Sequence, residues 1–301
     1  MTLAVPAATT VPDVSGAAER YVPLSSSESL RVLELGAGDP VVLIPGLFGS
    51  AFCFRRVVPR LAEAGYRAIV VEPLGVGGSS RPEAADYSLT AQADRLDRAL
   101  EVLGVERSVV VAHAVAGSIA FRLAYRHPQR VAAIVSLDGG PTETAATPGF
   151  RRAMRFAPLL KLFGGIKRIR GVVHKTLTTR SADASWVTEE VVDGYMGAAS
   201  RDLDATLAGY RGMARAREPQ QIGPHLHEIS CPVHLVVGGV RHEGGPPLAE
   251  VQLLRERLPS FVVETVPGVG HFLFEEDPPA FVEAVNRARE SWRRAAAAAQ
   301  K

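Results

Sequence analysis

Ser108-Val-Val-Val-Ala-His-Ala-Val-Ala-Gly-Ser-Ile-Ala-Phe121 is the stretch around which the rest of the chain is organised. Its β-branched run, Val109 to Val111, predicts a buried strand. The run ends at a cluster of small residues, and an apolar helical pattern follows through Ile119 and Phe121. A strand, a sharp turn and a helix in this order are the layout of a nucleophile elbow, whose usual pattern is small-x-Ser-x-small.

The turn of this motif carries no nucleophile. Ala112 and Ala116 occupy its small positions, and Gly117 follows them. The position between them, where a serine is expected, is Ala114, which has neither a hydroxyl nor a carboxylate group. The residues elsewhere in the chain therefore decide whether this turn belongs to a catalytic site.

The composition predicts a soluble domain with a large core. The chain has 301 residues, of which 47% are hydrophobic, and a formal net charge of +2, which gives no general argument for nucleic-acid binding. Cys53 and Cys231 are far apart in the sequence, so we expect two small core side chains rather than a disulfide or a metal site. With no recognisable signal peptide and no run of about 18 apolar residues, we expect a cytoplasmic protein without stable membrane insertion. No pattern indicates an oligomeric state.

Strands alternate with helices along most of the chain, which predicts an α/β fold with a mostly parallel sheet. We expect strands at 29–35, 41–44, 68–71, 109–111, 131–137, 233–237 and 262–266. The first two are close enough to form a hairpin. The expected domains are an N-terminal arm (1–24), a core (25–141 and 229–293), a helical insertion (142–228) and a C-terminal tail (294–301).

Irregular stretches follow the carboxyl ends of these strands, where parallel sheets bind their ligands. Residues from about 28 to 290 resemble the α/β-hydrolase superfamily, and four of these stretches carry the resemblance. They are an oxyanion loop (45–49), a Gly-rich loop (75–79), the elbow (112–117) and a terminal Gly-x-x-His (268–271). The departures are Pro45, where many members carry His, and Ala114. The resemblance implies a sheet flanked by helices, with a helical cap inserted after the strand that follows the elbow, as in capped serine esterases.

The resemblance also implies roles for individual residues. His271 is the candidate base, and the backbone amides of Leu47 and Val115 are the candidate oxyanion donors. The acid is open between Asp138, at the end of the strand after the elbow, and Glu243, and we favour Asp138. Many relatives carry the acid three residues after a glycine in the later loop, but here that position is Arg241, which cannot serve.

Two interpretations of Ala114 follow. We favour an engineered Ser→Ala replacement in a serine hydrolase, because removal of the nucleophile typically lowers turnover by about 10⁶-fold and leaves binding in place. The alternative is a natural alanine. His271 would then act as a base in a lyase or a cofactor-free oxygenase, or the protein would only bind a ligand.

The insertion and the loops predict an apolar pocket that suits an ester or lactone with a hydrophobic body. Its expected substrate-binding residues are Phe48, Phe52, His113, Trp186 and Phe272. Residues 151–180 hold nine Lys and Arg and no Asp or Glu. We interpret this stretch as the solvated face of a cap helix, with contact to a membrane or to an anionic substrate as the alternatives. No nucleotide, metal or phosphate motif is recognisable, so we expect no cofactor.

Overall fold

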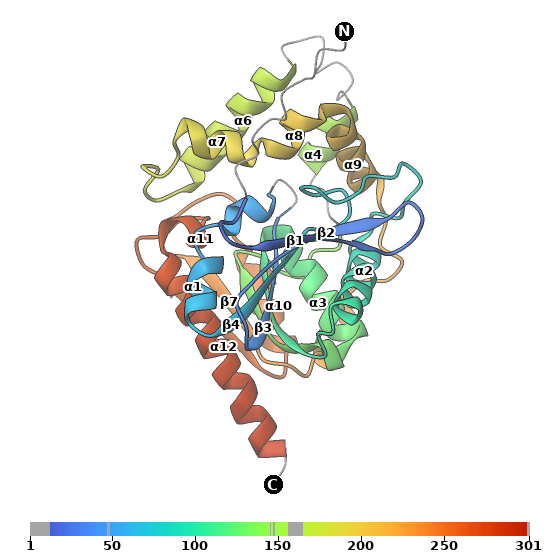
Figure 1. Cartoon of the computed structure of the whole chain (residues 1–301). Coiled ribbons are helices and arrows are strands. Elements are labelled where there is room, and N and C mark those ends of the chain that lie inside the picture. The colour runs from blue at the N-terminus through green and yellow to red at the C-terminus, as the bar shows by residue number, and fades with distance from the viewer. Residues whose placement is uncertain (1–12, 47–48, 145, 147, 156–164, 300–301) are drawn as a thin grey trace.

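The computed structural model describes residues 13–46, 49–144, 146, 148–155 and 165–299, and its sheet has eight strands in the order β1-β2-β4-β3-β5-β6-β7-β8 (Figure 1). β1 and β2, and β2 and β4, pair antiparallel, and all other pairs are parallel. The strands are β1 Ala18–Pro23, β2 Ser29–Leu35, β3 Asp39–Ile44, β4 Tyr66–Val71, β5 Ser108–His113, β6 Val131–Leu137, β7 Val233–Gly238 and β8 Phe261–Val266. The α/β architecture expected from the sequence is confirmed.

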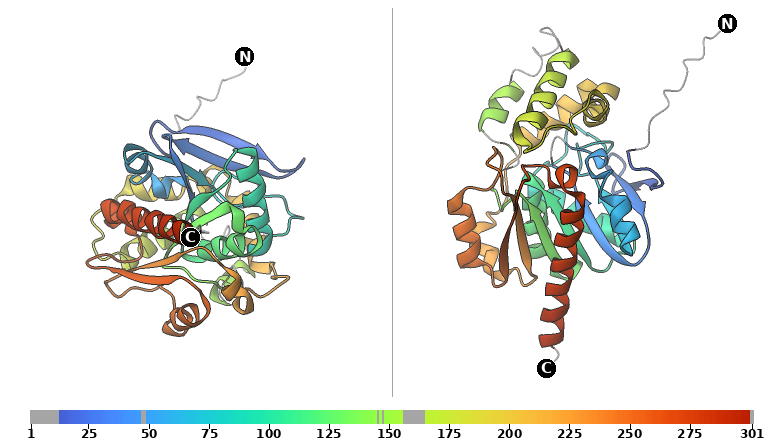
Figure 2. Two further views of the ribbon diagram at one scale, coloured as in Figure 1. Left: turned by 90° about the horizontal axis from the view of Figure 1, so that it is seen from below. Right: turned by 90° about the vertical axis from the view of Figure 1, so that its left-hand side faces the viewer.

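Helices cover both faces of this sheet (Figures 1 and 2). One apolar cluster contains Leu96, Phe121 and Leu254, and it joins the sheet to α2 Leu89–Val102, α3 Gly117–Arg126 and α10 Leu248–Arg257. A second cluster contains Leu61 and Phe281, and it joins the opposite face to α1 Val58–Glu63 and α12 Pro278–Ala299. The short elements are η1 Ala51–Phe54, η2 Ala114–Ala116, η3 Pro128–Arg130, η4 Gly223–Glu228 and α11 Leu273–Glu276.

Two expectations about the first strands and the N-terminal arm need correction. Residues 29–35 and 41–44 do not form a hairpin, because β4 lies between β2 and β3. Residues 41–44 are fully buried, which requires a central place in the sheet between two strands. The expected arm contains β1, whose backbone pairs with β2 along six residues. The expected tail continues α12 to Ala299, in keeping with the high helix propensity of its alanine run.

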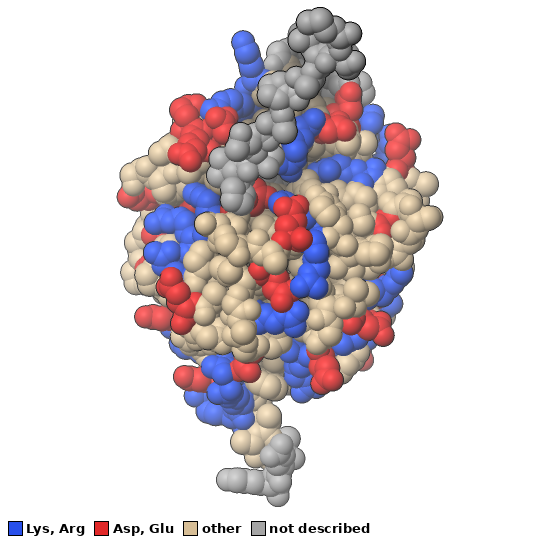
Figure 3. Space-filling model, viewed as in Figure 1, with Lys and Arg blue, Asp and Glu red and all other residues tan. Residues whose placement is uncertain are grey.

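A layer of helices lies beyond the carboxyl ends of the parallel strands, and we call it the cap (Figures 1 and 2). Its helices are α4 Pro148–Arg155, α6 Gly165–Arg180, α7 Glu189–Tyr195, α8 Gly197–Arg201 and α9 Leu203–Arg215. On α6, Lys167, Arg168 and Lys175 are exposed, and basic side chains are visible on this part of the surface in Figure 3. Within the described ranges, no helix is long and apolar enough to cross a membrane.

A buried carboxylate organises two loops at the edge of the sheet nearest the cap. Glu72 follows β4, is fully buried, and accepts hydrogen bonds from the backbone amides of Ala51 (2.6 Å) and Gly78 (2.5 Å). The Arg31 guanidinium lies 3.4 Å from the same carboxylate. Gly77 has φ 56°, and a Cβ at this position would lie 2.1 Å from Cδ of Glu72. Only glycine therefore allows the Gly-rich loop to wrap around this side chain.

Candidate active site

The elbow has the backbone of a strained strand-to-helix turn. All six residues of β5 are buried, and Ala114 directly after it has φ 51°. This left-handed conformation costs an L-residue roughly 1–2 kcal/mol. The turn also packs closely on the loop that follows β6, because a Cβ on Gly139 would lie 2.1 Å from the carbonyl oxygen of Ala114. The structure therefore holds residue 114 in a conformation that its own side chain does not favour.

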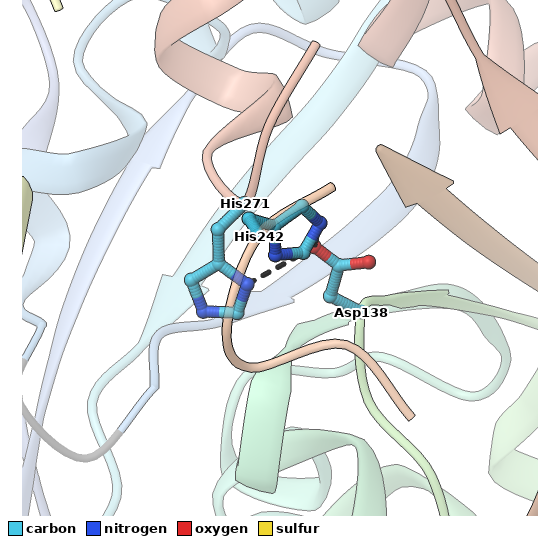
Figure 4. A group of neighbouring side chains, drawn as sticks. All are labelled: Asp138, His242 and His271. Carbon is cyan, nitrogen blue, oxygen red and sulfur yellow. Dashed lines mark hydrogen bonds and ion pairs between the residues drawn. The ribbon is translucent and has the colours of Figure 1, made fainter. Parts of the chain in front are cut away.

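His271 and Asp138 are brought together from opposite ends of the core (Figure 4). Nδ1 of His271 lies 3.0 Å from Oδ2 of Asp138, and both residues are only 4% exposed. Asp138 follows β6 with φ 49°, and this second strained backbone directs its carboxylate toward the loop after β8. Within the described part of the chain, Nε2 of His271 has no hydrogen-bond partner. The imidazole is thus oriented by one nitrogen and has the other available.

A second imidazole, which the sequence did not indicate, contacts the same carboxylate. Nε2 of His242 lies 3.2 Å from Oδ2 of Asp138, and the ring centroids of His242 and His271 are 5.3 Å apart (Figure 4). The neighbouring Glu243, the alternative acid, is exposed, and no contact between its carboxylate and His271 is found among the described residues. The structure therefore pairs Asp138 and not Glu243 with His271. The position of His242 in the loop after β7, at a carboxyl strand end, is the signal that could have pointed to it.

Asp138, His242 and His271 also offer one ligand atom each within 4.8 Å of one another. Two imidazoles and a carboxylate are a set that binds transition metals. Here each nitrogen that faces Asp138 is already at hydrogen-bond distance from Oδ2. Of these two contacts, the one with His271 is a hydrogen bond, and Oδ1 of Asp138 is buried without a hydrogen-bond partner among the described residues.

Burial sets the protonation of this group. It raises the pKa of Asp138 to about 7, a rise that His242 and the amide of Gly238 oppose and Glu276 reinforces. Burial also lowers the pKa of His271 to about 3, and the charges of Arg180 and His242 add to this decrease. At neutral pH His271 is therefore uncharged, which is the state that a general base requires.

His113 contacts His271, the candidate base. Its ring centroid is 4.5 Å from that of His271, and its Nε2–H donates to the backbone carbonyl of His271 at 3.1 Å. Burial holds the pKa of His113 well below its usual value, so this ring is neutral as well. A Cβ on Gly46 would lie 3.3 Å from Nδ1 of His113, which places the start of the oxyanion loop against the elbow.

Aromatic rings connect the base to the cap. The Phe272 ring lies 5.6 Å from Trp186, and the Tyr195 ring lies 6.3 Å from Trp186 and 5.7 Å from Phe52. Three of the expected substrate-binding side chains, from η1, the cap and the His271 loop, thus belong to one wall, and Tyr195 joins them. The other predicted residues are less well defined: Val115 is half-buried against the core, while Leu47 and Phe48 lie outside the described residues.

Comparison with known proteins places this chain in a family. Residues 39–188 match the family model described as the α/β hydrolase fold. The chain belongs to the α/β-hydrolase family. A crystal structure of wild-type Cfl2 from Burkholderia cenocepacia is similar to this hydrolase with a TM-score of 0.75 and 25% identity, over 92% of this chain and 97% of that one.

Two curated relatives come from Mycobacterium tuberculosis. An uncharacterised protein is 27% identical to this hydrolase over 262 residues, which is 84% of this chain and 75% of that protein. Epoxide hydrolase A is 36% identical over 122 residues, 40% of this chain and 38% of its own length. The family model ends at residue 188, so His271 lies outside the residues that it matches.

Proposed function

We propose that this α/β hydrolase acts on a carboxylic ester or lactone with a hydrophobic body, and that residue 114 is the position of its nucleophile. The observation that carries this proposal is the combination of a strained elbow at Ala114 with a neutral imidazole whose Nδ1 lies 3.0 Å from Asp138. A backbone strained at one residue is typical of sites where that residue must be presented to a substrate. The aromatic wall of Phe52, Trp186 and Phe272 suits an apolar body.

The chemistry follows from the positions of these groups. A serine hydroxyl at position 114 would attack the substrate carbonyl while Nε2 of His271 takes its proton. Asp138 would hold Nδ1–H of His271 and stabilise the imidazolium that forms. His271 would then return the proton to the leaving alkoxide, and a water molecule activated by His271 would hydrolyse the acyl-enzyme. In this proposal the amides of Val115 and Leu47 bind the developing oxyanion.

Alanine at position 114 removes the atom that forms the acyl-enzyme and leaves the base and the pocket in place. We therefore expect the parent chain, with alanine at position 114, to bind such an ester without hydrolysing it. An engineered Ser→Ala replacement in a serine hydrolase would have this result. Because nucleophile removal typically costs about 10⁶-fold in turnover, the reverse change is the most direct test.

The test compares the parent chain, Ala114→Ser, and Ala114→Ser combined with His271→Ala. We expect Ala114→Ser to hydrolyse p-nitrophenyl esters and to be labelled by a fluorophosphonate, with a gain of about 10³-fold or more over the parent. The double variant should lose this gain because the hydroxyl then has no base. A folded Ala114→Ser protein that is inert to both reagents would contradict the proposal.

A second candidate keeps alanine as the working residue. It is favoured by the neutral His271, whose Nε2 has no partner among the described residues, and by the alanine at position 114, which offers no nucleophile. His271 would then remove a proton from a C–H or hydroxyl group of the substrate. Turnover by the parent chain that is lost in His271→Ala would support this function over the first.

The name of one relative suggests a further arm of the same experiment. Epoxide hydrolase A matches this chain over part of its length. A carboxylate at the elbow is a nucleophile that can open an epoxide through an ester intermediate. Ala114→Asp should therefore be assayed on epoxides beside Ala114→Ser on esters, and the more active variant identifies the substrate class of the pocket.

A further inference from the structure

The carboxylate of Glu276 holds both flanks of the His271 loop. Its Oε2 accepts a hydrogen bond from the amide of Gly270 at 3.1 Å, and its Oε1 accepts one from the amide of Phe272 at 3.2 Å. These are the residues directly before and after His271. Glu276 is the last residue of α11, one turn further along the same segment. The backbone that carries the candidate base is thus fixed on two sides by a single side chain.

The same carboxylate also binds the cap. Oε2 of Glu276 accepts from the amide of Ala182 at 2.7 Å, in the loop that follows cap helix α6. In the same contact, the amide of His271 donates to the carbonyl oxygen of Arg180 at 2.8 Å. A Cβ on Gly270 would lie 2.4 Å from that oxygen, so only glycine lets the two backbones approach this closely. The cap loop and the His271 loop are therefore packed backbone to backbone.

We propose that Glu276 is a positioning residue that couples the seating of the cap to the placement of the His271 imidazole. This inference rests on the proposed function, because it assigns the imidazole the role of base. With Glu276 in place, the amides of residues 270, 272 and 182 share one acceptor, so His271 keeps its distance to Asp138 only while the cap loop is docked. Without it, the amides of Gly270 and Phe272 lose their side-chain acceptor, and the ring is free to leave the 3.0 Å contact with Asp138.

The neighbouring Glu275 offers a matched control. Its carboxylate is fully buried and accepts from the Tyr195 hydroxyl of the cap at 2.9 Å, and it also pairs with Arg55. It therefore joins the cap to the core, as Glu276 does, but no contact with the amides of residues 270–272 is found among the described residues. A general loosening of the cap should respond to both positions, whereas positioning of His271 should respond to Glu276 alone.

The experiment uses the full chain with Ala114→Ser, and adds Glu276→Gln, Glu276→Ala or Glu275→Gln. Amide hydrogen exchange of residues 182 and 270–272 and the downfield proton resonance of the His271 imidazole, assigned by its loss in His271→Ala, are measured beside ester kinetics. We expect exchange in Glu276→Gln to become at least about tenfold faster at these amides. We also expect a broadened imidazole resonance and a lower kcat with little change in KM. Glu276→Ala should show larger effects, because Gln keeps one acceptor oxygen.

The measurements on Glu276→Ala and Glu275→Gln decide whether the cap and the His271 imidazole are coupled. Unchanged exchange and an unchanged imidazole resonance in Glu276→Ala would overturn it, as would equal changes in Glu275→Gln. If the Ala114→Ser background shows no esterase activity, the proposed function fails, but the exchange and resonance measurements still decide whether Glu276 positions His271.

Discussion

Two imidazoles lie against one carboxylate oxygen of Asp138, and this arrangement determines how the site responds to pH. Oδ2 lies 3.0 Å from Nδ1 of His271 and 3.2 Å from Nε2 of His242. A carboxylate can orient His271 and stabilise its imidazolium only when it is ionised. Because burial raises the pKa of Asp138 to about 7 and lowers that of His271 to about 3, ionisation of the carboxylate is the step that falls in the physiological range.

The pH profile of the Ala114→Ser variant should therefore rise through about pH 7. Below that pH Asp138 gains a proton, whereas His271 stays neutral down to about pH 3. His242 lowers the pKa of Asp138, so His242→Leu should move the rising limb to higher pH, and His242→Gln, which keeps an N–H group beside the carboxylate, should show the smaller loss of kcat/KM. The measurement is kcat/KM from pH 5 to 9, and the apparent value belongs to the coupled group. A limb that does not move in His242→Leu would show that His242 has no part in this ionisation.

The buried carboxylate of Glu72 holds two loops together. It is fully buried, and its partners are the amides of Ala51 and Gly78 and the guanidinium of Arg31. Without Glu72, Arg31 keeps two other carboxylate partners, whereas a buried donor that loses its acceptor costs about 1–3 kcal/mol. The same change leaves two loop amides without an acceptor.

Glu72→Ala should lower the free energy of unfolding by about 2–6 kcal/mol in urea denaturation, about 1–3 kcal/mol for each of the two amides. The matched control is Glu34→Ala, which removes a carboxylate that binds Arg20 and Arg67 nearer the surface, and it should cost about 1 kcal/mol or less. Equal losses in the two variants would show that burial of Glu72 contributes nothing beyond a surface ion pair.

The order of strands and helices was predictable, but strand pairing was not. Local patterns indicate which segments are strands, while the insertion of β4 between β2 and β3 depends on contacts between distant segments. Asp138 and His271 were found because both follow strands at the carboxyl edge. His242 lies in the loop between β7 and α10, and no fixed spacing from another motif residue marks it. Glu276 binds backbone amides, and backbone amides leave no trace in a sequence.

The cap contacts the core closely at two places, and a glycine of the cap lies at each of them. On one side, a Cβ on Gly194 of α7 would lie 2.1 Å from the end of the Phe52 ring. On the other side, a Cβ on Gly212 of α9 would lie 2.5 Å from the ring of Tyr87. These close contacts fix how far the aromatic wall of the cap lies from the elbow and the His271 loop. The separation between the cap and the core is thus set by the absence of two side chains.

Enlarging one of these glycines should therefore displace the cap. In Gly194→Val the new side chain must push against Phe52, whose ring is held between Tyr195 and Arg55. We expect the free energy of unfolding to fall by about 1–3 kcal/mol, which is typical of overpacking. We also expect a changed fluorescence of Trp186, which lies 6.3 Å from the Tyr195 ring, in a Trp292→Phe background that leaves this single tryptophan. The control is Gly171→Ala in α6, where a Cβ meets open space and should stabilise the helix by about 0.5–1 kcal/mol. If Gly194→Val keeps both the stability and the fluorescence of its background, the cap is not seated on Phe52, and its separation from the core must be set by other contacts.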